Sequence, residues 1–425
     1  MRIKNLKRMK NFLISTLLLI TFSASAQKNV APPAPVLPIP TKAQLAWHDM
    51  ELNAFIHFTT NTFTGLEWGL GSEKESVFNP GGVHVDQWVS VLKRAGFKGI
   101  ILTCKHHDGF CLWPSKYTEH SIKNSPYKGG KGDIVKELSD ECKKQHVKFG
   151  VYLSPWDRNR ADYGKPSYIT YYRNQLKELF TAYGPIFEMW FDGANGGSGY
   201  YGGANEMRNV DKTTYYDWPN TLSLVRSMEP NIILFSDAGP GVRWCGNESG
   251  HVNKTNWDMI STDTLYAGKA GVENLLSTGS EDGTKWIPAE SDVSIRPGWL
   301  FHAKEDSLLK TPEQLFTIYL NTVGRGSLML LNVPPDRDGY LYKNDVKSLE
   351  GFHALLDREF KTDIARNATV KVSSVRGGSP KYGGYNLIDN NPQTYWATDD
   401  NVKTGTIELD WNKVQTIKYV VLKEY

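Results

Sequence analysis

Short hydrophobic runs recur along the first 330 residues, and segments with helical periodicity separate most of them. The runs are four to six residues long and rich in branched and aromatic side chains, which predicts buried β-strands. They cover residues 53–58, 99–103, 149–153, 186–191, 232–235, 259–262, 286–289 and 327–332. Segments with the spacing of amphipathic helices cover residues 85–95, 134–146, 168–183, 218–228 and 312–323.

The alternation of strands and helices predicts an α/β fold with a parallel sheet, and eight strands favour a (β/α)8, TIM-like barrel. An open doubly wound sheet is the alternative. That alternative lacks its usual dinucleotide signature, because no G-x-G-x-x-G motif opens a helix after any predicted strand. We therefore expect a barrel domain over residues 45–360.

Polar residues of the types that act in catalysis and ligand binding lie where the predicted strands end. They are His57 at the first strand, His106, His107 and Asp108 at the second, Tyr152 and Trp156-Asp157-Arg158 at the third, Asp192 at the fourth, Asp237 at the fifth, Asp263 at the sixth, and Glu290 with Asp292 at the seventh. In a barrel the carboxyl ends of all strands share one mouth, so this pattern predicts an active site there. Asp192-Gly193 is also compatible with an ordinary turn.

The two ends of the chain differ in character from the predicted barrel. Five basic residues, an apolar run at residues 12–22 and Ala24-Ser25-Ala26 predict a signal peptide over residues 1–26. We expect a bacterial protein that is exported, periplasmic or secreted, with a proline-rich lead-in at residues 27–44. The apolar run is shorter than the ~20 residues of a membrane-spanning helix, and no later segment reaches that length, so no membrane span is expected.

Residues 366–425 contain strand and turn patterns without helical periodicity, which predicts an all-β module. The apparent strands include residues 385–390, 394–399 and 417–422. A β-sandwich needs about 100 residues, so we expect this module to be the start of a sandwich that is incomplete in this sequence.

Composition narrows the class of protein. The formal charge is +3, and removal of residues 1–26 with their five basic and no acidic residues brings it to −2. This balance predicts no nucleic-acid partner. The four cysteines are too scattered for a disulfide framework. Thirteen tryptophans in an exported protein suit either stacking on sugar rings or a large aromatic core.

Carboxylates, histidines and tryptophans at a barrel mouth suggest hydrolysis of a glycosidic bond by two carboxyl groups. A metal-dependent hydrolase is the rival, because His106-His107-Asp108 offers metal ligands. Adjacent histidines in an extended segment point in opposite directions, however, and residue 59 is threonine, so His57 gains no second histidine two positions on. A third reading leaves these histidines in hydrogen bonds within the rim.

Five motifs in order resemble the α-L-fucosidases of glycoside hydrolase family 29 over residues 45–350. They are Phe55-Ile56-His57-Phe58, Glu67-Trp68-Gly69, Lys105-His106-His107-Asp108-Gly109-Phe110, Tyr152-Leu153-Ser154-Pro155-Trp156-Asp157 and Met189-Trp190-Phe191-Asp192-Gly193-Ala194. Arg243-Trp244-Cys245-Gly246-Asn247-Glu248 and Arg296-Pro297-Gly298-Trp299 further resemble the branch that acts on α-1,3 and α-1,4 linkages of Lewis-type glycans. The tail resembles a discoidin-like, galactose-binding-like carbohydrate-binding module.

The resemblance implies a retaining exo-α-L-fucosidase that uses no metal and no cofactor and acts on a fucosylated oligosaccharide or glycoconjugate. Asp192 would be the nucleophile and Glu248 the acid/base, with Glu290 as the second candidate for that role and Asp237 as the third. The expected substrate-binding residues are His57, Glu67, Trp68, His106, His107, Tyr152, Trp190, Arg243 and Trp299. The loops at residues 196–207 and 266–285 would contact the leaving-group sugar. A catalytically inert fucose-binding lectin on the same barrel and a metal-dependent barrel hydrolase stay open as alternatives.

Overall fold

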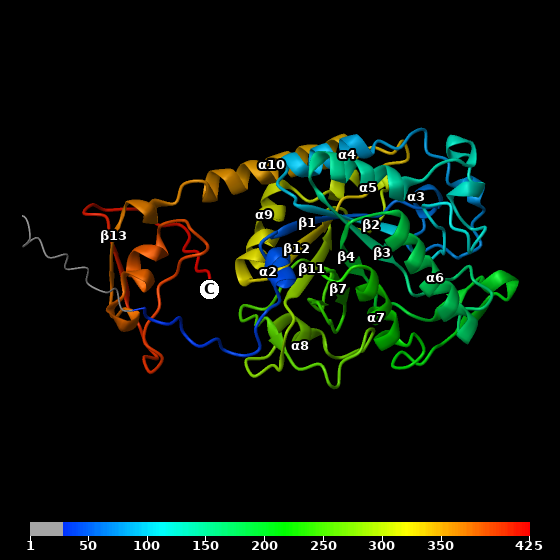
Figure 1. Cartoon of the computed structure of the whole chain (residues 1–425). Coiled ribbons are helices and arrows are strands. Elements are labelled where there is room, and N and C mark those ends of the chain that lie inside the picture. Colours follow the sequence, from blue (N-terminus) through cyan, green and yellow to red (C-terminus); the bar gives the residue numbers. More distant parts are fainter. Residues whose placement is uncertain (1–28) are drawn as a thin grey trace, which may run out of the picture. The chain divides into compact units, whose positions relative to one another are not determined.

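The computed structural model describes residues 29–425, so the predicted signal peptide lies outside the described residues. The chain divides into two compact units (Figure 1). The larger unit covers residues 36–361. The smaller unit combines residues 362–425 with the segment that precedes the larger unit.

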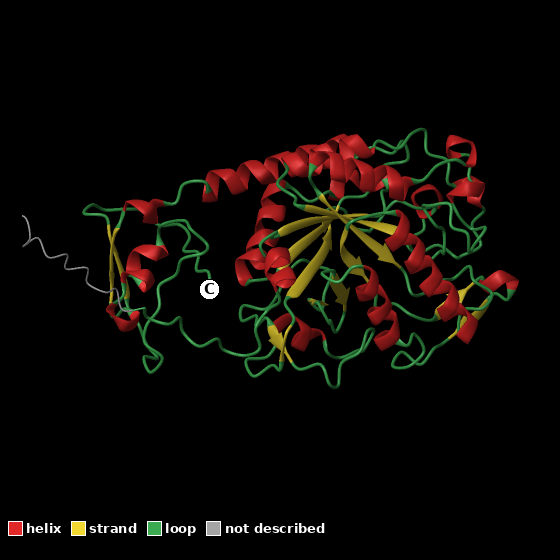
Figure 2. Cartoon of the chain, viewed as in Figure 1, coloured by secondary structure: helices red, strands yellow, loops and turns green. Residues whose placement is uncertain are grey.

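The larger unit is a closed barrel of eight parallel strands, as the sequence predicts. Figure 2 shows these strands gathered at the centre of the unit with helices around them. In the order in which they pair around the barrel, the strands are β1 (Leu52–Ile56), β12 (Leu328–Asn332), β11 (Ala289–Ser294), β8 (Val242–Trp244), β7 (Ile233–Ser236), β4 (Ile186–Trp190), β3 (Lys148–Leu153) and β2 (Gly99–Lys105). β1 pairs with both β2 and β12, which closes the ring.

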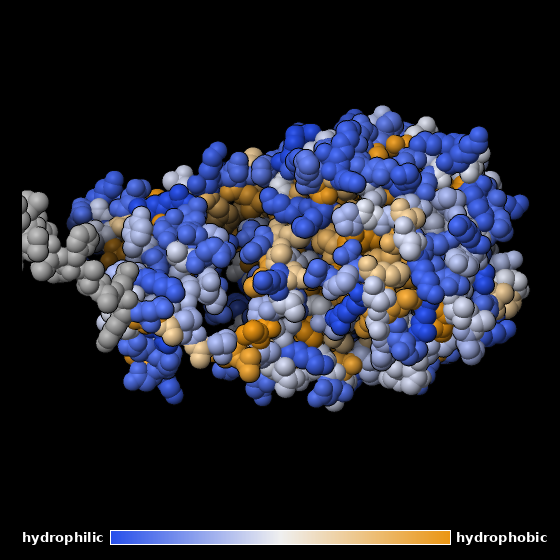
Figure 3. Space-filling model, viewed as in Figure 1, coloured by the Kyte–Doolittle hydropathy of each residue, from blue (hydrophilic) through white to orange (hydrophobic). Residues whose placement is uncertain are grey.

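Helices follow most of the strands and pack on the outside of the barrel. They are α2 (Lys42–His48), α3 (Asn61–Thr64), α4 (Val85–Arg94), α5 (Ile134–Gln145), α6 (Pro166–Ala182), α7 (Trp218–Met228), α8 (Glu273–Thr278), α9 (Pro312–Asn321) and α10 (Lys343–Phe360). Hydrophilic side chains predominate on the face of this unit drawn in Figure 3.

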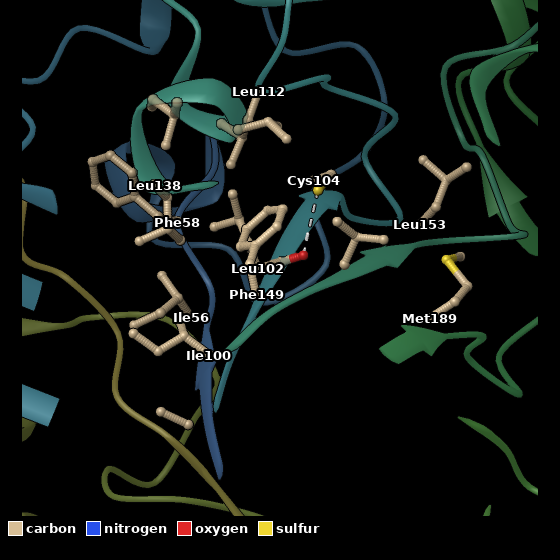
Figure 4. Close-up of a cluster of buried hydrophobic side chains, with 14 of the residues drawn as sticks. Ile56, Phe58, Ile100, Leu102, Cys104, Leu112, Leu138, Phe149, Leu153 and Met189 are labelled. Carbon is tan, nitrogen blue, oxygen red and sulfur yellow. Dashed lines mark hydrogen bonds between the residues drawn. The ribbon is translucent and has the colours of Figure 1, made fainter. Parts of the chain in front are cut away.

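Alternation along the strands creates two separate hydrophobic layers. Outward-facing residues such as Ile100 and Leu102 pack against helical residues such as Leu138 in the layer drawn in Figure 4. Inward-facing aromatic residues, including Phe55 and Trp190, fill the barrel itself. The barrel is therefore a packed core whose upper layer is free to form a site.

Helix α2 covers the end of the barrel at which the strands begin. The side-chain amide of Gln44 donates hydrogen bonds of 2.8 Å to the carbonyl oxygens of Gly241 and Trp286. Trp47 is buried among the inward-facing residues. This end is thus sealed, and the opposite end remains for function.

The predicted sixth strand is wrong. Residues Met259–Ile260 form β9, which pairs antiparallel with β10 (Lys285–Trp286) in a separate two-stranded sheet. The true sixth strand is β8, which follows β7 after a connection at residues 237–241 and without an intervening helix. Its three residues carry an arginine in the middle, so hydrophobicity does not mark it as a strand.

The predicted seventh strand overlaps β11 only at Ala289. Polar residues occupy the positions of β11 that face the barrel interior, so no hydrophobic run marks this strand. The hydrophobic residues before it therefore give the stronger strand signal. Glu290 and Asp292 consequently lie within this strand and not after it.

The smaller unit contains one two-stranded antiparallel sheet, formed by β13 (Thr369–Val372) and β14 (Ile407–Asp410). Two of the predicted strands are replaced by other structure, because Gly384–Leu387 forms a 3-10 helix and residues 394–399 form turns and coil. Residues 417–422 are not a strand either. Arg376 and Tyr382 donate hydrogen bonds of 2.7 and 3.1 Å to the carbonyl oxygens of Ala31 and Val30. Residues 29–35 of the lead-in thus join this unit, whereas residues 36–44 belong to the larger unit.

Two further features concern the described residues. All four cysteines are buried with free thiols. None of the helices within residues 29–425 is long and apolar enough to cross a membrane.

A buried ion pair ties the end of β11 to α10. Nε and a terminal nitrogen of Arg296 donate to the two carboxylate oxygens of Asp345 at 2.9 and 2.6 Å, and both side chains are fully buried. Arg296 also donates to Asp306 at 3.0 Å, but that side chain is 34% exposed, so removal of the Asp345 charge leaves the buried guanidinium with only a partner that solvent screens. We expect Asp345→Asn to lower the free energy of unfolding by about 3 kcal/mol, measured by urea denaturation.

The matched control is Asp357→Asn, which changes an exposed residue of the same helix and should leave stability within about 0.5 kcal/mol of the wild type. Equal stability of the two variants would show that the pair does not hold this helix to the barrel.

Candidate active site

A pocket of about 230 Å³ opens at the carboxyl ends of the barrel strands. Its lining combines aromatic rings, imidazoles and carboxyl groups. The residues that line it are Phe55, His57, Trp68, His106, His107, Tyr152, Trp190, Asp192, Gly193, Ala194, Asp237, Trp244, Glu248, Asp292 and Trp299. The site therefore lies where the barrel topology predicts it.

Asp192 follows β4 and presents its carboxylate to the pocket. One oxygen accepts a hydrogen bond of 2.5 Å from the backbone N–H of Ala194, and the other accepts one of 2.9 Å from the hydroxyl of Tyr152. Nε2 of His107 lies 3.9 Å from the latter oxygen. The side chain is 22% exposed, so the carboxylate is both held in place and accessible to a ligand.

Three buried histidines form one wall of the pocket. Burial lowers the pKa of His57 to about 3, and burial also lowers the pKa values of His106 and His107. Nδ1 of His57 lies 2.9 Å from the side-chain oxygen of Asn332, and Nδ1 of His107 lies 2.7 Å from the hydroxyl oxygen of Ser154. The rings are therefore neutral near pH 7, and each offers one donor and one acceptor nitrogen.

Nδ1 of His106 is buried and has no hydrogen-bond partner. Such a polar atom is costly unless a ligand or water satisfies it. Within residues 29–425, no three His, Cys, Asp or Glu side chains form a group that could hold a metal ion. A polar ligand with hydroxyl groups suits this wall.

Glu248 lies at the pocket four residues after β8. The residue as a whole is exposed. Partial burial of its carboxyl group, together with the negative charge of Asp192, raises the pKa of Glu248, against the opposing effect of a hydrogen bond from the Trp299 side chain. A carboxyl group of this kind can hold a proton near neutral pH and release it to a ligand.

Two more carboxyl groups border the pocket. Burial, with the charge of Asp192 as an added cause, raises the pKa of Asp237 to about 6. Burial and the charges of Glu248 and Asp192 raise the pKa of Asp292 well above its usual range. The indole N–H of Trp244 donates to Asp292 at 2.8 Å, and the backbone N–H of Gly268 donates to Asp237 at 2.7 Å.

Sequence reasoning placed Asp237 and Asp292 at the barrel mouth but gave Asp292 no role, and it did not select Phe55 or Trp244. Phe55 and Trp244 stand inside quoted motifs and face the barrel interior, so strand alternation was the signal that could have found them. Asp263, by contrast, is exposed and does not line the pocket, because the strand expected before it is not part of the barrel.

Glu67 lies behind the pocket wall. Its carboxylate accepts a hydrogen bond from the backbone N–H of Trp299, and the side-chain amide of Asn332 donates to the carbonyl oxygen of Trp299 at 2.8 Å. Burial raises the pKa of Glu67. In this structure Glu67 holds the residue that lines the pocket and is not itself among the lining residues.

Two expected site residues lie away from the pocket. Arg243 sits between the inward-facing Val242 and Trp244 of β8, so its side chain points out of the barrel. Its guanidinium is fully buried and donates to the carbonyl oxygens of Leu276 and Ile287. This placement corrects the expectation that Arg243 contacts substrate.

Glu290 faces the barrel interior but precedes Asp292 by two residues, which places it one layer below the pocket. It is fully buried and accepts a hydrogen bond of 3.1 Å from the indole N–H of Trp190. It does not line the pocket. Glu290 therefore does not have the access to ligand that an acid/base needs, and Glu248 does.

Comparisons with known proteins indicate one family. The family model for α-L-fucosidases matches residues 38–359. The chain is 40% identical over 415 residues to α-L-fucosidase 1 of Arabidopsis thaliana. The alignment covers 97% of this chain and 79% of that protein.

Solved structures give the same result. A glycoside hydrolase 29 fucosidase of Ruminococcus gnavus in complex with fucose is 37% identical, with a TM-score of 0.80 over 91% of this chain and 81% of that chain. A glycoside hydrolase 29 member from an unknown rumen bacterium is 48% identical, with a TM-score of 0.76 over 80% of this chain and 60% of that chain.

A glycine next to Asp192 makes room for a neighbouring carboxyl group. A methyl group on Gly193 would overlap the side chain of Asp237, which the N–H of Gly268 holds in place. We expect Gly193→Ala to lower the free energy of unfolding by about 2 kcal/mol, measured in urea. Gly324→Ala is the control, because its nearest neighbours leave 3.8 Å or more.

Addition of Asp237→Ala removes the overlapping atoms. The double variant Gly193→Ala/Asp237→Ala should therefore be more stable than the sum of the two single effects predicts, by about 1 kcal/mol. Strict additivity would mean that Asp237 does not fix the turn after Asp192.

Proposed function

This chain belongs to the α-L-fucosidase family of glycoside hydrolases, and on that premise we propose that it releases terminal α-1,3- or α-1,4-linked L-fucose from Lewis-type glycans with retention of configuration. The observation that carries this proposal is the pair formed by Asp192 and Glu248. Both carboxyl groups line one pocket; two donors hold Asp192, and burial raises the pKa of Glu248. Retaining glycosidases need one ionised carboxylate and one protonated carboxyl group.

In the first step, a carboxylate oxygen of Asp192 attacks the anomeric carbon of fucose. The glycosidic bond breaks as Glu248 transfers its proton to the leaving oxygen, and a glycosyl-enzyme ester forms at Asp192. The hydrogen bonds from Ala194 and Tyr152 fix the attacking group. They also stabilise it as an anion until it reacts.

In the second step, Glu248 acts as a base. It takes a proton from a water molecule, whose oxygen attacks the anomeric carbon and releases Asp192 as a carboxylate. Two inversions at the same carbon give net retention. The exposure of Glu248 gives water and the leaving sugar access to this position.

Glu248 suits the acid/base role better than the other two carboxyl groups at the pocket. Each of the three accepts one N–H, from Gly268 at Asp237, from Trp244 at Asp292 and from the Trp299 side chain at Glu248, so the difference between them lies in their exposure. Asp292 is almost completely buried, whereas the glycosidic oxygen must lie between the fucose pocket and solvent.

The remaining lining suits a deoxy sugar. Neutral His57, His106 and His107 can each donate and accept hydrogen bonds with hydroxyl groups, and Nδ1 of His106 has no partner within the protein. The faces of Phe55 and Trp190 offer an apolar surface for the C5 methyl group.

The linkage preference rests on the resemblance of residues 243–248 and 296–299 to the Lewis-acting branch. Glu248 and Trp299 from these segments both line the pocket. The hairpin of β5 (Gly197–Gly199) and β6 (Glu206–Arg208), with Met207 exposed, supplies a surface for the leaving sugar.

We propose two further properties from the sequence. The leader pattern at residues 1–26 supports export to the periplasm or outside of a bacterial cell. The tail at residues 366–425 would belong to a carbohydrate-binding-like β-sandwich, and the antiparallel pair of β13 and β14 supports this proposal.

The proposal is tested with an aryl α-L-fucoside and a Lewis-type trisaccharide, both assayed with a metal chelator present. We expect Asp192→Asn to lower kcat/KM for both substrates by more than about 10³-fold. Glu248→Gln should lower kcat/KM about 10²- to 10⁴-fold on the trisaccharide and far less on an aryl leaving group, which needs little protonation. Asp263→Asn is the matched control, because Asp263 is exposed outside the pocket.

The pH dependence of kcat/KM tests the role of Glu248 independently. Glu248 loses its proton as pH rises through its raised pKa, so kcat/KM for the trisaccharide should fall on the alkaline side. Glu248→Gln should lack this fall. Full activity of Asp192→Asn, or loss of wild-type activity with the chelator, would contradict the two-carboxyl mechanism.

A further inference from the structure

Two glutamates meet inside the barrel, between the pocket and the end closed by α2. Glu188 comes from β4 and Glu290 from β11, and both are fully buried. Neither lines the pocket, so neither takes part in the chemistry proposed above. Buried carboxyl groups without a cationic partner need another explanation.

Each glutamate has one carboxyl oxygen bonded to an indole. Trp47 donates its N–H to Oε2 of Glu188 at 2.9 Å, and Trp190 donates its N–H to Oε2 of Glu290 at 3.1 Å. The other oxygen of each, Oε1, is buried and has no donor. Each carboxyl group acts on the pKa of the other, so the two lie close together, and one proton between the two Oε1 atoms would give both a hydrogen-bond partner.

The surroundings favour retention of that proton. Burial raises the pKa of Glu188 to about 7, and burial together with the charge of Glu188 raises the pKa of Glu290 well above its usual range. Asp292, two residues along β11, is the other ionisable group that acts on Glu290, and its charge has the same sign. Two carboxylates in contact inside a protein cannot both ionise at neutral pH.

We propose that Glu188 and Glu290 share one proton as a carboxylic acid and carboxylate pair, and that this pair positions Trp190 in the pocket wall. Trp190 has its indole N–H fixed by Glu290 and its ring stacked on Phe235, with 3.8 Å between the ring centroids. The same ring lies 5.5 Å from that of Tyr152, whose hydroxyl bonds Asp192. The pair thus supports the sugar wall and the residue that orients the nucleophile.

Proton counting tests the pair without any reference to catalysis. Above about pH 7, until the pair itself loses its last proton, the native pair holds a proton that the unfolded chain has lost, because an unfolded glutamate ionises near pH 4.5. The equilibrium constant for unfolding of the wild type therefore increases tenfold for each unit of pH increase because of this one proton. A group with a raised pKa loses its stabilising effect as pH rises, so stability falls in this window.

Glu188→Gln and Glu290→Gln each replace the shared proton by an amide N–H, so each should make this dependence shallower by one proton. The double variant should also lose one proton and not two. We expect both single variants to fold, because an amide group fits where either carboxyl group of the pair stands. An unchanged slope, a loss of two protons in the double variant, or failure of both amides to fold would overturn the proposal.

The positioning role rests on the proposed function and has its own readout. Glu290→Gln keeps an acceptor for Trp190 and should retain activity on the aryl α-L-fucoside within about threefold, whereas Glu290→Leu should raise KM about tenfold. Glu178→Gln is the matched control, because Glu178 accepts the indole N–H of Trp113 at 3.0 Å away from the pocket. Equal KM values for the Gln and Leu variants would remove the positioning role.

These outcomes are separable from failure of the proposed function. If the wild type hydrolyses no fucoside, proton counting still decides whether the pair exists. If Glu290→Gln loses activity on the trisaccharide more than 10²-fold but keeps it on the aryl fucoside, Glu290 is a general acid and the positioning role is overturned.

Discussion

The structure depends on how one barrel accommodates several carboxyl groups with little water to screen them. Asp192, Asp237, Glu248 and Asp292 border one pocket, and Glu188 and Glu290 lie beneath it. Like charges at such distances oppose ionisation, and burial adds to the effect. The chain resolves this conflict by giving most of these groups raised pKa values and by directing two hydrogen-bond donors at Asp192.

That constraint explains features of the surrounding architecture. Indole N–H groups of Trp47, Trp190 and Trp244 each satisfy a carboxyl oxygen while their rings fill the barrel. Tryptophan suits this position because it combines a large apolar surface with one donor. The abundance of tryptophan that the sequence shows is therefore explained in part by the barrel interior, and in part by a pocket wall suited to a sugar.

Much of this arrangement could be predicted from the residues. Six of the barrel strands and the site at their carboxyl ends follow from hydrophobic runs and from polar residues such as His57 and Asp192. β8 could not be predicted in this way, because its three residues carry Arg243 at the centre and no helix precedes it. The error moved the seventh strand as well and made Glu290 look like a rim residue. Three strands expected in the tail were also wrong, because its apolar residues lie in turns and coil as well as in β13 and β14.

Pattern alone does not reveal which carboxyl group is ionised, since that depends on donors brought from distant parts of the chain. Tyr152 lies 40 residues before Asp192, yet its hydroxyl donates to one carboxylate oxygen of Asp192 while the N–H of Ala194 donates to the other. The sequence could name both residues, whereas only the fold shows that they meet.

The central claim is that Asp192 is the group that bonds to the sugar. Its most direct test is mass spectrometry of the protein after reaction with a 2-fluoro fucosyl fluoride. The fluorine at C2 slows both formation and hydrolysis of the glycosyl-enzyme ester, whereas the fluoride leaving group speeds only its formation, so the ester accumulates. We expect one fluorofucosyl group per molecule, located by peptide fragmentation at Asp192. Attachment at another residue, or turnover of the reagent with no covalent adduct, would contradict the account.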